Sequence, residues 1–96
     1  MTEQFSRFDA AEFLKTPAEM AAYLDACFAE DAGDGVLIRA ALNDIARAQG
    51  MTQVARDAGL GRESLYKALS STGNPEFATI IKVMKALGMR LHATAI

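Results

Sequence analysis

Residues 51–70 read MTQVARDAGLGRESLYKALS, and this stretch decides the fold. Its apolar spacing predicts a short helix over residues 53–58, with Thr52 as the N-cap, and a second helix over residues 62–69. Between them stands Gly59, which adopts without strain the positive φ angle that a sharp turn requires. The stretch therefore predicts a helix-turn-helix, a unit that places its second helix in the major groove of DNA.

The outer face of this unit is polar. Arg62, Glu63 and Lys67 fall on or near the exposed N-terminal part of the second helix, where a recognition helix carries its base-reading side chains. Arginine pairs with guanine, glutamate accepts from cytosine, and lysine suits guanine or phosphate. The predicted DNA-binding residues are Thr52, Gln53, Arg62, Glu63, Ser64, Tyr66, Lys67, Ser71 and Asn74. The same apolar spacing also fits a plain αα-hairpin in a helical bundle, and that alternative stays open.

The segment before this unit is predicted to form two further helices. The sequence TPAE at residues 16–19 is a capping box with proline at the first helical position, so a helix begins there and ends near Glu30. Apolar residues at three- and four-residue spacings predict another helix over residues 36–49, and Gly50 is its C-terminal cap.

The C-terminal part is predicted to hold one more helix. Asn74 and Pro75 cap its start, and Gly88 ends it. Its apolar row consists of Phe77, Ile80, Ile81, Met84 and Leu87. Residues 89–96 have the composition of a short strand, which would need to pair with a second copy of the chain. The expected fold is all-α, a compact bundle of about five helices with a possible short C-terminal strand.

Charge divides the chain into two regions, although the net charge of its 96 residues is only −2. Residues 1–49 hold four basic and nine acidic side chains, whereas residues 50–96 hold six basic and three acidic ones. The basic half suits the phosphates of DNA and the acidic half suits a basic protein. Ordinary solvated surface charge would explain the same division.

Several classes of protein do not fit this sequence. The single cysteine, Cys27, forms no internal disulfide, and no apolar run approaches the ~20 residues that cross a membrane. The N-terminus lacks the apolar core of a signal peptide, so a cytoplasmic location is expected. His92 is the only histidine and lies in the tail, far in sequence from Cys27 and Ser64. Neither a metal ligand set nor a Ser-His-Asp hydrolase site is expected from this spacing. We therefore expect no catalytic residues, no metal and no cofactor.

Three segments together carry a resemblance to a known family: residues 40–50, residues 51–70 and residues 73–88, with further likeness over residues 8–14. They resemble the addiction-module antidote proteins, antitoxins of the HigA type with a Cro- and lambda-repressor-like domain. The resemblance covers about residues 8–92, and Gly61 departs from it because serine or threonine more often caps the recognition helix. It implies an antitoxin that neutralises a RelE/HigB-like ribonuclease toxin and represses their shared operon.

Two regions then take separate roles within one compact domain. Residues 1–35 form an N-terminal helical segment that is a candidate toxin-binding region, and residues 36–96 form the lambda-repressor-like DNA-binding region. The candidate toxin-binding residues are Phe5, Phe8, Phe13 and Tyr23, whose rings would equally well seal the protein's own core. The expected partners are a palindromic DNA operator, bound by a homodimer, and the toxin. The alternative is a free-standing phage-type repressor without a toxin.

Overall fold

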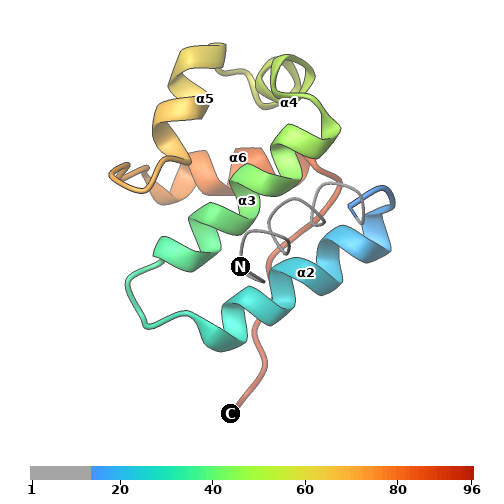
Figure 1. The fold of residues 1–96 in the computed structure, drawn as a ribbon, viewed down its shortest axis with the longest axis vertical. Helices are drawn as coiled ribbons and strands as arrows, with labels where there is room; N and C mark the ends of the chain where they lie inside the picture. Colours follow the sequence, from blue (N-terminus) through green and yellow to red (C-terminus); the bar gives the residue numbers. More distant parts are fainter. Residues whose placement is uncertain (1–13) are drawn as a thin grey trace, which may run out of the picture.

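The computed structural model describes residues 14–96, and within them it contains five helices and no strand. Figure 1 shows α4 and α5 at one end of the molecule, with α2, α3 and α6 beneath them. The helices in chain order are α2 (Pro17–Glu30), α3 (Val36–Gln49), α4 (Met51–Ala58), α5 (Arg62–Ala68) and α6 (Phe77–Ala86). The all-helical fold class that the sequence predicts is confirmed.

The first of these helices begins at the predicted capping box. The Thr16 hydroxyl accepts from the Glu19 backbone N–H at 3.2 Å, and the Glu19 carboxylate accepts from the Thr16 N–H at 3.1 Å. Pro17 occupies the first helical position, where its missing N–H costs nothing. One face of α2 then enters the core through Met20, Leu24 and Cys27.

A single carboxylate joins α2 to α3. Asp31 ends α2, and one of its oxygens accepts from the backbone N–H groups of Gly33 at 2.8 Å and Gly35 at 3.0 Å. The other oxygen accepts from the N–H groups of Leu37 at 3.0 Å and Ile38 at 3.4 Å. These last two donors lie in the first turn of α3 and have no partner within the helix, so Asp31 fixes how α3 follows α2.

The break between α3 and α4 is only one residue long. Gly50 has a φ angle of 104°, ends α3 through its N–H and begins α4 by accepting from the Val54 N–H at 3.0 Å. The predicted start of α4 is therefore wrong by two residues. Thr52 is the second residue of the helix and makes no cap, because the preceding glycine already turns the chain.

Two tight connections flank α5. Gly59, with a φ angle of 73°, ends α4 as predicted, and Gly61 begins α5 without any side-chain cap. After α5 the chain folds back on itself at Gly73, where an added Cβ would meet the carbonyl oxygen of Ala68 at 2.8 Å and that of Lys67 closer still. Arg39 of α3 donates to the carbonyls of residues 70 and 71 and holds this turn.

The last helix begins later than predicted. Glu76 is its N-cap, and its carbonyl accepts from Thr79 and Ile80, so Asn74 and Pro75 lie before the helix and do not cap it. The N-terminal end of the predicted apolar row is also wrong, since the Phe77 side chain is 71% exposed. Residues 89–96 form no strand in the single chain, and Figure 1 shows the C-terminus at the end of the molecule opposite α4 and α5.

One core cluster draws on all five helices. Its fully buried members include Leu42 and Ile45 from α3, Leu65 from α5 and Val83 from α6. The remaining buried members are Leu14, Met20, Leu24, Cys27, Ala41, Ala46, Met51, Val54, Ala55, Leu69, Met84 and Leu87. The apolar spacing of residues 51–70 is thus that of core side chains. Val54, Ala55, Leu65 and Leu69 are buried in the cluster, and the half-buried Leu60 packs against it.

Candidate nucleic-acid interface

An open hollow of about 520 Å³ lies where the end of α3, the start of α4 and the start of α5 meet. We call it the α4–α5 hollow. Its lining residues are Arg47, Gly50, Met51, Thr52, Gln53, Arg62 and Tyr66. Four of the predicted DNA-binding residues, Thr52, Gln53, Arg62 and Tyr66, therefore line one surface although they come from two helices.

The hollow carries positive charge from two sources. Arg47, in the last turn of α3, and Arg62, at the start of α5, both line it. The first N–H groups of α4 also have no partner within the helix, and the N-cap Gly50 has no side chain to accept from them. Unpartnered N–H groups at a helix start favour an anion. The hollow is thus suited to a phosphate group.

Arg62 and Tyr66 form a stacked pair on α5. The guanidinium carbon of Arg62 lies 5.2 Å from the centroid of the Tyr66 ring, within the range of a cation–π contact. One guanidinium nitrogen also donates to the Tyr66 hydroxyl at 3.3 Å. Both side chains are exposed, with Tyr66 at 43%. The pair orders the guanidinium on the surface of the protein without burying it.

Gln53 is held by its own helix. Its amide nitrogen donates to the Asp57 carboxylate at 2.9 Å, and its amide oxygen accepts from Arg56 at 3.4 Å. Residues 53, 56 and 57 are neighbours on one helical face, so these bonds orient the amide at the mouth of the hollow.

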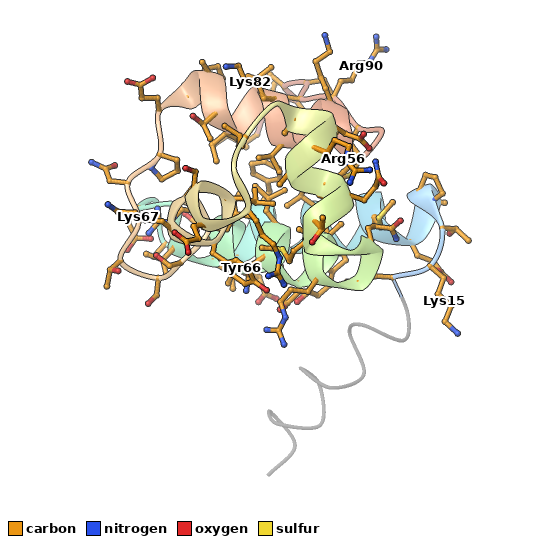
Figure 2. All side chains as sticks on the ribbon, turned by 90° about the horizontal axis from the view of Figure 1, so that it is seen from above. Lys15, Arg56, Tyr66, Lys67, Lys82 and Arg90 are labelled. Carbon is orange, nitrogen blue, oxygen red and sulfur yellow. The ribbon has the colours of Figure 1, made fainter. Side chains whose placement is uncertain are left out.

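The other predicted DNA-binding residues lie outside the hollow. Glu63, Ser64, Lys67, Ser71 and Asn74 are all exposed on α5 and on the connection that follows it. Figure 2 looks onto α4 and α5 and shows Tyr66 and Lys67 projecting from α5, with Lys82 and Arg90 at the opposite edge. The predicted residues therefore share the α5 end of the molecule, but only some of them share one surface.

Sequence reasoning missed two arginines in this region. Arg47 lines the hollow, and Arg39 holds the turn after α5. For Arg47 a signal was available, because a basic residue in the last turn before Gly50 must lie near the start of the next helix. No sequence pattern points from Arg39 to carbonyls more than thirty residues away.

The candidate toxin-binding residues are placed less completely. Phe5, Phe8 and Phe13 lie outside the described residues. Tyr23 is half-buried, packs against the core and donates its hydroxyl hydrogen to Asp44 at 2.7 Å. Its position fits the alternative in which the ring seals the core. Two other apolar side chains of this acidic region are more exposed, Phe28 at 39% and Val36 at 40%.

Among residues 14–96, no group of three or more histidine, cysteine, aspartate or glutamate side chains is placed to hold a metal ion. Burial raises the pKa of the Cys27 thiol, and the nearby carboxylate of Asp44 adds to the rise. A thiol of this kind is a poor nucleophile at neutral pH. Within the same residues no helix has the length and apolar character needed to cross a membrane.

Comparison with known proteins decides the family. The model of a family described as probable addiction module antidote protein matches residues 4–95. The chain belongs to this family. An uncharacterized protein of Haemophilus influenzae is 57% identical over 92 residues, which are 96% of this chain and 93% of the relative. No solved structure matches the chain.

Membership of the antidote family supports an antitoxin role, and an antitoxin implies a toxin as partner. Proteins of this family are generally not enzymes. The family match covers α2 to α6, so both the acidic hairpin of α2 and α3 and the α4–α5 hollow belong to the part that defines the family.

Proposed function

We propose that this antidote protein binds a RelE/HigB-like ribonuclease toxin and represses its own operon by binding DNA through α4 and α5. In this proposal α4 and α5 are a helix-turn-helix, and α5 is the helix that reads bases. The observation that carries the DNA-binding part is the α4–α5 hollow, in which two arginines and the start of α4 face the same space. Phosphate at the hollow would set the register, and Arg62 would reach base edges.

A charge-matched pair of variants tests the DNA-binding part. Arg62→Ala should weaken binding to the operator by about fivefold to 150-fold, the effect of losing one bidentate guanine contact. Lys15→Ala also removes one positive charge, but Lys15 lies at the start of the chain's described part, away from α5 in Figure 2. It should leave affinity unchanged in a fluorescence anisotropy titration. If Arg62→Ala weakens binding to the operator and to a random duplex by the same factor, Arg62 does not read bases.

The proposed toxin-binding surface is the acidic hairpin of α2 and α3. Phe28 and Val36 are exposed apolar anchors there, beside acidic side chains that would attract a basic ribonuclease. Phe28→Ala with Val36→Ala should abolish co-purification with the toxin encoded by the adjacent gene, while circular dichroism and operator affinity stay unchanged. Retained co-purification would remove this hairpin from the interface. If the wild-type protein co-purifies with no product of a neighbouring gene, the alternative of a free-standing repressor is supported.

The proposed repressor binds a palindromic operator as a homodimer, with half-site centres about 34 Å apart or at a multiple of that spacing. The outward side of α6 is suited to the two-fold contact. Phe77, the half-buried Ile81 and Lys85 are four residues apart, so an antiparallel copy would place Phe77 against Lys85 and Ile81 against Ile81. Figure 2 shows α6 at the side of the α4–α5 face, so both copies of α5 would meet the same DNA.

Two variants distinguish this dimer contact from the one expected of the C-terminal tail. Phe77→Glu should yield monomers in sedimentation that bind the operator poorly, whereas deletion of residues 90–96 should leave the dimer intact. The reverse pattern would place the contact in the tail, which ends opposite α5 in Figure 1.

A further inference from the structure

The stacked pair of Arg62 and Tyr66 has a feature that a simple guanine contact does not need. Within α4 and α5, both of which the structure describes in full, Tyr66 is the only exposed large apolar side chain. Its ring covers the guanidinium at 5.2 Å, and its hydroxyl accepts one guanidinium hydrogen bond at 3.3 Å. Both residues line the same open hollow, so a ligand that enters it meets a cationic fork and an aromatic ring side by side.

Each half of this pair has a different counterpart in the major groove. A guanidinium has five donor hydrogens, so one bond to Tyr66 leaves a fork that can bind O6 and N7 of guanine. An exposed ring gains little from phosphate, but it gains from the one apolar group in the groove, the methyl group at C5 of thymine. Neighbouring bases lie about 3.4 Å apart along a strand, so two side chains in contact with each other can reach two adjoining bases.

We propose that Arg62 and Tyr66 together read a thymine–guanine step, with Arg62 on the guanine and the Tyr66 ring on the methyl group of the adjoining thymine. This inference rests on the proposed DNA-binding function and adds the identity of two neighbouring bases in each half-site. A cytosine methylated at C5 presents the same methyl group and replaces the thymine. Tyr66 is then a specificity-determining residue that also orders the guanidinium.

The test begins with a random-sequence duplex pool, from which the full-length protein selects its preferred sites. Each thymine of a selected half-site is then replaced by uracil, which removes the methyl group and keeps every hydrogen-bonding group. Replacement in the proposed step should weaken binding about fourfold, as expected for one buried methyl group. In two further duplexes the same thymine is replaced by 5-methylcytosine or by cytosine, with guanine opposite. The protein should bind the methylated duplex more tightly than the unmethylated one by a similar factor.

Two variants connect this effect to the ring. Tyr66→Phe keeps the ring and should keep the fourfold response to uracil, whereas Tyr66→Ala should bind thymine and uracil duplexes equally. Neither variant should change the melting temperature by much, because the side chain is 43% exposed and α5 tolerates both residues.

Three results would overturn the inference while leaving DNA binding intact. They are selected sites without a thymine–guanine step, no response to uracil at any thymine, or an unchanged response in Tyr66→Ala. If the selection instead enriches no sequence and the protein binds no duplex, the proposed DNA-binding function fails, and the reading of bases fails with it. The uracil series therefore separates the two failures.

Discussion

The α2–α3 hairpin and the α4–α5 unit use their polar side chains in opposite ways. In the hairpin, the Asp31 carboxylate accepts hydrogen bonds from four backbone N–H groups, and the Tyr23 hydroxyl donates to Asp44 in a part-buried position. In the α4–α5 unit, Arg62 contacts an exposed ring on its own helix, and Arg47 faces an open hollow. The same residue classes complete the fold in one region and are presented to solvent in the other.

This difference separates stability from binding. A carboxylate that accepts hydrogen bonds from helix N–H groups contributes to folding. Its removal should therefore lower the free energy of unfolding and change the affinity for a partner only indirectly. An exposed arginine contributes little to folding, so its removal should leave stability unchanged. The comparison fails if variants of the hollow prove to melt early, or if variants of the hairpin's internal hydrogen bonds prove to leave stability untouched.

The largest expected effect is that of Gly73→Ala. Gly73 closes the turn after α5, and Arg39 of α3 holds the same turn, so this position connects the two regions. A Cβ there would collide with the carbonyls of Lys67 and Ala68, which are backbone atoms and move only with the helix. We expect a loss of about 1–3 kcal/mol in the free energy of unfolding, measured by urea denaturation. Gly61→Ala is the control, since its Cβ would meet only the Ser64 hydroxyl at 3.8 Å. Equal losses would exclude the collision.

Tyr23→Phe tests the hairpin. The variant keeps the ring in the core and removes the hydroxyl that donates to Asp44 at 2.7 Å. We expect the free energy of unfolding to fall by about 1–2 kcal/mol, because a hydrogen bond to a charged group contributes about 1.5–3 kcal/mol and the part-buried position lowers this value. Operator affinity and toxin capture should stay as in the wild type. A variant of unchanged stability that loses the toxin would return Tyr23 to the candidate binding surface.

Local signals predicted the hairpin well because its helices begin and end through nearby residues. The capping box at Thr16 and the glycine at residue 50 act within a single turn, and the helices bounded by them are as predicted. The predicted starts of α4 and α6 are wrong for two different reasons. Gly50 ends α3 and also begins α4, so α4 starts before Thr52. After Pro75 the chain continues to Glu76 before it becomes helical, so α6 starts later than the proline indicates.

The candidate site was predicted only in part because its surface is made by packing. Spacing on α5 was enough to group Arg62 with Tyr66, which are four residues apart. Their position beside Thr52 depends on how α4 and α5 cross, and the presence of Arg47 depends on how α3 meets α4. The exposure of Phe77 likewise follows from the late start of α6 and not from its place in an apolar row.

Arg47→Ala should have a smaller effect than Arg62→Ala, and of a different kind. If Arg47 meets phosphate at the hollow, its loss should weaken binding to every duplex sequence by the same factor. The slope of log affinity against log salt concentration should then become shallower by about one ion. Anisotropy titrations at four salt concentrations measure this slope. A loss confined to one base pair of the operator would instead make Arg47 a base-reading residue.

The smallest expected effect concerns pH and belongs to the hairpin. Bonds from the backbone N–H groups of Gly35 and Gly33, followed by those of Ile38 and Leu37, hold the pKa of Asp31 below its ordinary value of 3.8. Folding therefore favours the ionised carboxylate. Its contribution to stability is fully present above about pH 4 and is lost as the pH falls through the lowered pKa of the folded state.

Asp31→Asn should lower the urea midpoint at pH 7, and the difference from the wild type should shrink as the pH falls below 4. Asp25→Asn removes the same charge from the exposed surface of α2 and serves as the control. A difference between Asp31→Asn and the wild type that stays constant down to pH 2 would mean that the carboxylate's charge does not hold α3 in place.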